Sequence, residues 1–323
     1  MNAPTPAPSK PLTPTAPAKP ATSLTPSASK PVSLKGAPPF KMSAPNSAIG
    51  KWLKLMAYAR PGAGKTTLVC SAVDVPQMND VLMINAEKGD LVIEDNERIK
   101  HPELLRENII GVDNFMTVAK IHEFLKSHCH FRDLGDENKL RETEAWLRGC
   151  EPSEIVKPKK FRTVIIDSLT EIDIYCTYGL LGITQEKVLH GEASDIEVAR
   201  FDEFRKNNQM VQMLCRAFRD LPIHVLATAH ETYSEDELRK KHYMPQLTGQ
   251  LRTQVPGFFD IVGYLTYTKE GENITRKLMV QPIGPFVAKN RRPIFKPDHF
   301  KNPTMLDIMK GTMLFTENTA ASS

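Results

Sequence analysis

The sequence has no long hydrophobic run, and this absence argues against a membrane-spanning helix. None of its apolar stretches approaches the roughly 18 residues that a bilayer crossing requires. The N-terminal region also lacks the apolar block of a signal peptide, because proline recurs there every few positions. These two absences predict a cytoplasmic protein that makes no contact with a membrane.

Cysteine is scarce as well, with five residues in a chain of 323. No two of them have the paired spacing of a zinc site or a disulfide framework, so we expect reduced, buried thiols. His128, Cys129 and His130 stand side by side and suggest a metal cluster. Adjacent residues of a helix point in different directions, however, so one metal ion cannot easily use all three.

Acidic residues are absent from the first 45 positions, which consist mainly of Pro, Ala, Ser, Thr and Lys. This stretch holds five lysines, which leaves 37 basic and 38 acidic residues, a balance of −1, in the rest of the chain. It has almost nothing large and apolar to bury, so we predict a disordered tail over residues 1–47. The tail is either a solvated linker or a weak cationic tether for DNA or an acidic partner.

What the sequence does have is a run of strand formers from Trp52 to Ala59, followed by a turn with two glycines and then a helix start. A triphosphate needs successive backbone N–H groups that converge on its oxygens, and glycine permits that conformation. We therefore predict that phosphates bind to Arg60, Pro61, Gly62, Ala63, Gly64, Lys65, Thr66 and Thr67. Lys65 would reach the β and γ phosphates, and the Thr66 hydroxyl would bind Mg²⁺. An ordinary glycine-rich turn is the alternative, and Ala59 stands where the motif usually has its first glycine.

A second strand, Val164 to Ile166, runs directly into Asp167. Ligands of open parallel sheets bind at the carboxyl ends of the strands, which is where this carboxylate would lie. We predict that Asp167 holds Mg²⁺ opposite Thr66. The alternative is that Asp167 caps the helix that follows it.

Apolar strands alternate with helical patterns along the chain, as in α/β proteins. Further strands are predicted near residues 81–87, 108–113 and 222–231, and a C-terminal β-hairpin near 259–281. Helices are predicted over residues 65–73, 115–128, 169–181 and 201–221, the last with its aromatic residues in the core; a Gly-containing loop is expected at 182–198. The sequence thus predicts one domain, residues 48–312, with a mostly parallel sheet flanked by helices, a surface insertion at 132–160 and a frayed end at 313–323.

Two groups of cations and one histidine invite functional interpretations. Arg239, Lys240 and Lys241 lie in an expected loop, residues 231–250, where they grip single-stranded DNA or form a solvated charge cluster. Lys289, Arg291 and Arg292 either reach a nucleotide on a neighbouring subunit or decorate the surface. His230 ends an apolar strand, where it either senses the γ phosphate or is a hydrogen-bonded core histidine.

Five parts of the sequence together resemble the phage nucleotide-binding P-loop proteins. They are the phosphate loop, the strand from Val81 to Glu87, and residues 164–171, 227–231 and 289–291. These are RecA-like ATPases that include phage single-strand annealing proteins of the Sak type. The resemblance covers roughly residues 48–310. It implies a RecA-like fold that binds ATP and Mg²⁺, forms a homo-oligomer and acts on single-stranded DNA in recombination or annealing, in the host cytoplasm.

By the same similarity, Glu87 would be the catalytic glutamate that orients and deprotonates the attacking water. Asp167 is followed by Ser168 and not by a second acid, which favours a RecA-like protein over the AAA+ branch. A surface turn acid is the alternative for Glu87.

Two other functions remain open on the sequence alone, a kinase for a small molecule and a nucleotide-gated DNA-binding module with little turnover. The sequence also leaves open the oligomer number, whether DNA stimulates hydrolysis, the choice between annealing and strand exchange, and the need for a single-strand-binding protein.

Overall fold

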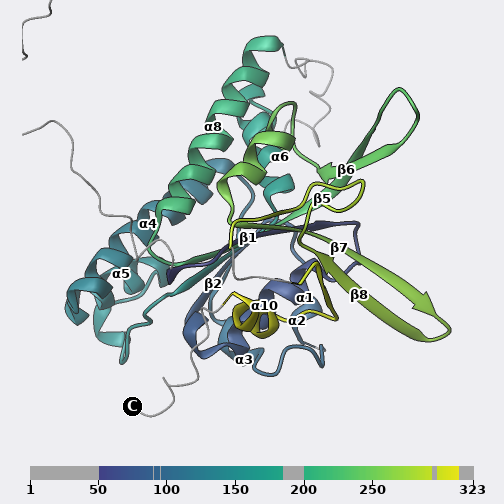
Figure 1. Ribbon diagram of the computed structural model, residues 1–323. Helices are drawn as coiled ribbons and strands as arrows, with labels where there is room; N and C mark the ends of the chain where they lie inside the picture. Colours follow the sequence, from purple (N-terminus) through teal and green to yellow (C-terminus); the bar gives the residue numbers. More distant parts are fainter. Residues whose placement is uncertain (1–50, 90, 95, 185–199, 293–296, 313–323) are drawn as a thin grey trace, which may run out of the picture. The chain divides into compact units, whose positions relative to one another are not determined.

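The computed structural model describes residues 51–89, 91–94, 96–184, 200–292 and 297–312 (Figure 1). The predicted tail at 1–47, most of the expected loop at 182–198 and the expected frayed end at 313–323 lie outside the described residues. The chain divides into two compact units, Met1–Pro45 and Asn46–Ser323, and the second unit contains every element described below.

A ten-stranded sheet forms the centre of this second unit, with the order β10-β8-β7-β1-β5-β4-β2-β3, while β6 pairs with β5 and β9 with β7. The strands are β1 (Lys54–Ala59), β2 (Val81–Asn85), β3 (Ile109–Gly111), β4 (Thr163–Asp167), β5 (His224–Glu235), β6 (Lys241–Pro245), β7 (Ile261–Glu270), β8 (Asn273–Met279), β9 (Lys289–Asn290) and β10 (His299–Lys301). From β7 through β1, β5, β4 and β2 to β3, neighbouring strands run parallel. The predicted mostly parallel sheet is confirmed.

Helices cover both faces of the sheet, as the continuous burial of its central strands requires. One face packs on α1 (Lys65–Cys70), α2 (Leu91–Glu94), α3 (Glu103–Arg106) and α10 (Met305–Gly311), and the other on α4 (Phe115–Leu134), α6 (Leu169–Leu181), α8 (Phe201–Asp220) and α9 (Leu251–Gln254). Short 3₁₀ turns follow α1 at Ser71–Asp74 and Pro76–Met78, and others lie at Pro152–Glu154 and Val255–Phe258. Because side chains alternate along a strand, β1 sends Met56 and Tyr58 to one apolar cluster and Leu55 and Ala57 to the other.

The helices differ from the sequence-based expectation in three places. Helix α1 ends at Cys70, three residues before the predicted end, and a 3₁₀ turn follows it. Helix α4 continues six residues past the predicted end at His128, to Leu134, and stops where Gly135 takes a left-handed conformation with φ 70°. In α8 the expectation of core aromatics is wrong for Phe201 and Phe204, which are 81% and 41% exposed. The buried positions of α8 begin only at Asn207, so its first turns have no layer to pack against among the described residues.

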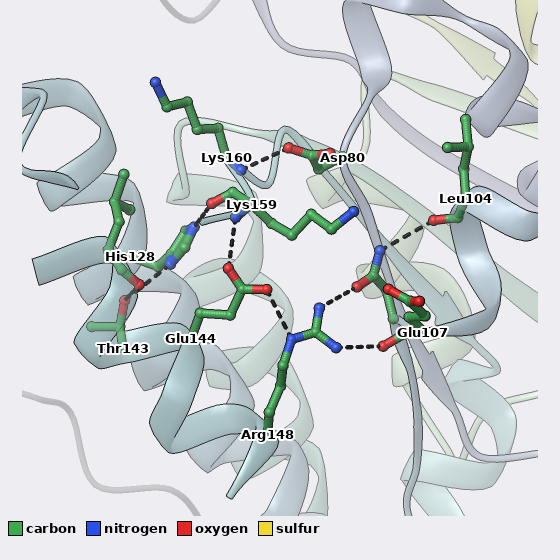
Figure 2. A network of polar contacts seen from close by, with 11 residues as sticks. Asp80, Leu104, Glu107, His128, Thr143, Glu144, Arg148, Lys159 and Lys160 are labelled. Atoms are coloured by element: carbon green, nitrogen blue, oxygen red, sulfur yellow. Dashed lines mark hydrogen bonds and ion pairs between the residues drawn. The ribbon is translucent and has the colours of Figure 1, made fainter. Parts of the chain in front are cut away.

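The segment predicted as a surface insertion contains α5 (Glu137–Arg148), which buries Leu140, Glu144 and Ala145 on one face. Figure 2 shows the polar contacts around Thr143, Glu144 and Arg148. Glu144, only 2% exposed, accepts hydrogen bonds from Arg148 Nε at 2.8 Å and from the backbone N–H of Lys159 at 2.6 Å. The His128 ring on α4 bonds the Thr143 hydroxyl and the Lys159 carbonyl oxygen at 3.1 and 2.9 Å. The His128–Thr143 contact joins α4 directly to α5, and Lys159 bonds to both His128 and Glu144. His128 is buried at these contacts, whereas its neighbour His130 is exposed.

Two β-hairpins extend past the carboxyl end of β1 (Figure 1). The first joins β5 to β6, and it replaces the loop expected over residues 231–250, because Glu231–Glu235 pairs antiparallel with Lys241–Pro245. The second joins β7 to β8 through a turn in which Gly271 has φ 61°, and it confirms the predicted C-terminal hairpin. Every helix in the described part of the chain is too short or too polar to span a bilayer.

Candidate nucleotide site

The loop between β1 and α1 has the conformation that the two glycines predict. Gly62 and Gly64 have φ of 75° and 98°, in the left-handed region that other residues seldom adopt. Ala63 N–H donates to the Arg60 carbonyl oxygen at 3.3 Å and closes a turn. An added Cβ on Gly62 would meet nothing within 4 Å, so conformation and not crowding requires glycine there. Such a turn presents backbone N–H groups to an anion.

Lys65 folds back across this loop and is only 5% exposed. Its Nζ atom lies 3.4 and 3.5 Å from the carbonyl oxygens of Arg60 and Ala59, and 3.5 Å from Nδ1 of His230. Burial lowers the pKa of Lys65, although the carboxylates of Glu87 and Asp167 oppose the shift. The amine is thus held in a partly desolvated place where a phosphate would be a favourable partner.

Asp167 at the end of β4 is fully buried and faces the start of α1. It accepts a hydrogen bond from Thr66 Oγ1 at 2.8 Å through one oxygen and from the Thr228 hydroxyl through the other. Burial raises the pKa of Asp167, because a carboxylate loses its hydration there.

This environment fits Mg²⁺, which prefers oxygen ligands and would offset the buried charge. Thr66 and Asp167 are the residues that would hold the ion. Among the described residues, no group of three or more His, Cys, Asp and Glu side chains could form a metal cage. Such a site suits an ion that takes its other ligands from phosphate and water, as Mg²⁺ usually does.

Glu87 lies two residues past β2, and its backbone N–H donates to the Asp167 carbonyl oxygen at 3.2 Å. Its carboxylate lies 3.1 Å from Nε2 of His230. Burial pushes the pKa of Glu87 upward, but the nearby His230, Ser168 and Lys65 side chains outweigh this effect, so the pKa is lowered. Glu87 is therefore an ionised carboxylate at neutral pH, beside the phosphate loop.

His230 connects the two charged groups, since its ring contacts both Lys65 and Glu87. Its backbone is fixed from both sides: its N–H donates to Thr170 Oγ1 at 2.9 Å, and its carbonyl oxygen accepts from Gln246 N–H at 2.8 Å. The histidine is partly exposed, with 21% of its side chain accessible. It lies at the site and not in the interior of the core.

The structure thus brings together Gly62–Thr67, Glu87, Asp167 and His230. The Arg60 side chain turns away from them, because its Nε atom pairs with Glu231 at 2.9 Å and the side chain is 63% exposed. Only the backbone of Arg60 belongs to the loop in this arrangement.

The cations Lys289, Arg291 and Arg292 do not join the site of their own chain. Lys289 lies in β9 and the two arginines follow it; β9 pairs with the first residues of β7, at the end of the sheet opposite the phosphate loop. Lys289 Nζ donates to the carbonyl oxygens of Pro256, Gly257 and Phe259 at 3.2, 2.9 and 2.7 Å. Arg291 bonds the Gly257 carbonyl oxygen, and Arg292 lies 3.7 Å from Asp260.

Arg239, Lys240 and Lys241 lie at the tip of the β5–β6 hairpin and are exposed. Three acids, Glu235, Asp236 and Glu237, share this tip, so its formal charge is balanced. Asp236 also accepts hydrogen bonds from the backbone N–H groups of Leu238 and Lys240. The expected basic loop is therefore a structured and electrically mixed turn.

Sequence reasoning missed two residues of the site, Thr228 and Arg276. Thr228 precedes His230 by two positions on a strand, so the two share a face, and this period could have revealed it. Arg276 on β8 donates from Nε to the Ala63 carbonyl oxygen at 3.1 Å. No local sequence pattern predicts a contact between two residues that are 213 positions apart in the chain.

Comparison with known proteins gives the family. No curated protein matches the chain. Among solved structures it is similar to the flagellar accessory protein FlaH from Methanocaldococcus jannaschii, at 11% identity, with 79% of this chain and 88% of that chain covered and a TM-score of 0.37. It is also similar to the RadB recombinase, at 16% identity, with 77% and 84% covered and a TM-score of 0.35. The family model described as an AAA domain matches residues 51–292, so the chain belongs to the AAA domain family of P-loop ATPases.

Proposed function

We propose that this protein is a Mg²⁺-dependent ATPase that acts on single-stranded DNA. The observation that supports hydrolysis most directly is the convergence of Lys65, Thr66, Glu87 and Asp167 at one phosphate loop. The loop amides and Lys65 bind the phosphates of ATP. Thr66 and Asp167 would hold Mg²⁺, which would supply the positive charge that neutralises the phosphate oxygens.

Glu87 is the general base of this proposal. Its lowered pKa keeps it ionised, and its backbone bond to Asp167 fixes it beside the metal ligand. A positioned carboxylate of this kind can take a proton from water as the water attacks the γ phosphate. His230 contacts both Glu87 and Lys65, which supports a role as sensor of the γ phosphate.

The DNA part of the proposal rests on the hairpin that begins at the sensor. His230 lies on β5, and the same strand continues to Glu235 at the tip of the β5–β6 hairpin. The hairpin presents Tyr233, 49% exposed, with Lys241 Nζ 4.3 Å from the centre of its ring. Exposed aromatic rings beside cations are what single-strand binding uses, because bases stack on the rings. With the tip's charge balanced, stacking on Tyr233 would contribute more than Arg239 and Lys240.

The biological setting follows from the resemblance of the motifs to phage recombination ATPases of the Sak type. On that basis the protein would form a homo-oligomer and promote annealing or strand exchange, with a single-strand-binding protein as a further partner. Lys289, Arg291 and Arg292 would complete a neighbour's site, at the expense of some carbonyl contacts in their own chain.

Turnover measurements on two variants test the enzyme. Glu87→Gln should still bind ATP but hydrolyse it 10²- to 10⁴-fold more slowly, the range for removal of a general base. Lys65→Ala should lose ATP binding. Glu142→Gln, on the surface of α5, should match the wild type in both assays.

Single-stranded DNA should stimulate the wild-type turnover. Wild-type hydrolysis by Glu87→Gln would remove this residue from the chemistry. If DNA does not change the rate of ATP turnover and turnover requires a small-molecule phosphate acceptor, the protein is instead a kinase.

A further inference from the structure

One cation that neither the sequence motifs nor the proposed mechanism uses lies against the phosphate loop. Arg276 extends from β8 so that its Nε atom donates to the Ala63 carbonyl oxygen at 3.1 Å. Its Nε, Cδ and Cζ atoms lie 3.0, 3.4 and 3.8 Å from the point that a Cβ on Gly64 would occupy. The guanidinium therefore fills the space that Gly64, the residue before Lys65, leaves open.

The position of Arg276 is fixed by its backbone. Its N–H donates to Asn302 Oδ1 at 2.8 Å, and its carbonyl oxygen accepts from Asn302 N–H at 2.7 Å. The residue also stands opposite Tyr267 in the register of the β7–β8 hairpin. An arginine held in this way loses little conformational entropy when it binds a ligand.

The charge of Arg276 has no acidic partner in the described part of the chain. Of its five N–H donors, only the Nε group has a hydrogen bond there. Arg98 is close enough to interact with it unfavourably, and that residue's own guanidinium donates to the Pro303 carbonyl oxygen. A half-buried cation with unused donors beside an anion-binding loop is suited to a phosphate group.

We propose that Arg276 binds the phosphates of the nucleotide from within the same chain and so closes the β7–β8 side of the site. The inference depends on the proposed nucleotide binding, because it adds a ligand to that site. The other side of the loop is met by β5, where Arg60 pairs with Glu231. The phosphate loop thus lies between the bases of the two hairpins, and a bound nucleotide would restrain the β7–β8 hairpin through Arg276.

Titration with a fluorescent ATP analogue, and with ADP as competitor, tests this assignment. Arg276→Gln should bind both nucleotides about tenfold more weakly, the loss expected for one charge-assisted contact. Arg276→Lys should recover part of the affinity, because it keeps the charge but not the planar fork. The matched control is Lys277→Gln, the next residue of the same strand, whose side chain points to the other face.

A second measurement separates phosphate binding from simple packing of the hairpin against the loop. In the wild type, ATP should protect the backbone amides of residues 268–277 from hydrogen exchange, and this protection should disappear in Arg276→Gln. Thermal unfolding without nucleotide should shift by no more than about 4 °C, because the variant loses only the hydrogen bond to the Ala63 carbonyl oxygen.

Wild-type affinity of Arg276→Gln, or equal weakening in Lys277→Gln, would overturn the assignment while leaving the ATPase proposal intact. Failure of Lys65→Ala to weaken binding would instead overturn the nucleotide site itself.

Discussion

At the scale of single residues, the buried carboxylate of Asp167 depends on two threonine hydroxyls. Thr66 is the residue that would move to the metal, whereas Thr228 lies on β5 and donates to the other oxygen. Thr228 therefore orients the carboxylate without touching the ion. Partners of this kind typically change metal affinity by 10- to 100-fold when they are removed.

The variant Thr228→Val should accordingly raise the Mg²⁺ concentration that half-saturates ATP turnover by about tenfold. Valine keeps the shape of the side chain, so the fully buried position stays filled. The measurement is a Mg²⁺ titration of hydrolysis at fixed ATP. Thr232→Val, on the same strand past His230, serves as the control. If the Mg²⁺ titration curve of Thr228→Val matches that of the wild type, the Thr228 hydroxyl only provides a hydrogen bond to the buried carboxylate and does not affect Mg²⁺ binding.

At the scale of elements, the pairing of α4 with α5 makes the fold sensitive to acid. His128 is fully buried between them, and burial lowers its pKa to about 4. An unfolded chain protonates this ring near pH 6.5, so below that value the unfolded state binds more protons than the folded state. The contribution to stability is therefore complete above pH 6.5 and declines as the pH falls toward 4.

Between pH 7.5 and pH 5 this one histidine should cost about 2 kcal/mol of the free energy of unfolding. Urea denaturation at the two pH values measures it. His128→Gln should lose less stability over the interval than the wild type by that amount, because an amide does not titrate. His130→Gln, at the exposed neighbour, should behave as the wild type. Equal pH dependence in all three proteins would contradict a buried neutral His128.

Elements whose apolar pattern lies within one short stretch of sequence could be predicted. Elements that form only by pairing with a segment distant in the sequence could not. Apolar runs that end in glycine or an acid predict β1, β4 and the phosphate loop. The strand Thr232–Glu235 is polar and becomes a strand only because Lys241–Met244 pairs with it. Leu140 and Glu144 likewise look like surface residues until α4 covers them. In the site, residues of the motifs were predictable, whereas Arg276 required the sheet to bring its strand to the loop.

At the scale of the whole molecule, charge is divided between the two parts of the chain. The segment before residue 46 holds five lysines and no acid, while the remainder has a balance of −1. Since the β5–β6 tip is itself balanced, long-range attraction of DNA would come mainly from the first segment. Each lysine that contacts a phosphate of a single strand contributes roughly 0.7 to the slope of log affinity against log salt concentration.

Removing residues 1–45 should therefore weaken single-stranded DNA binding and flatten its salt dependence by roughly 0.7 for each lysine engaged. Hydrolysis without DNA should not change, because Lys65, Glu87 and Asp167 all belong to the other unit. Filter binding or fluorescence anisotropy across a salt series measures both effects. A full-length variant with the five lysines replaced by glutamine separates charge from chain length. If that variant keeps the wild-type slope, the cations that hold DNA must lie on the ATPase domain, and the hairpins become the first place to look for them.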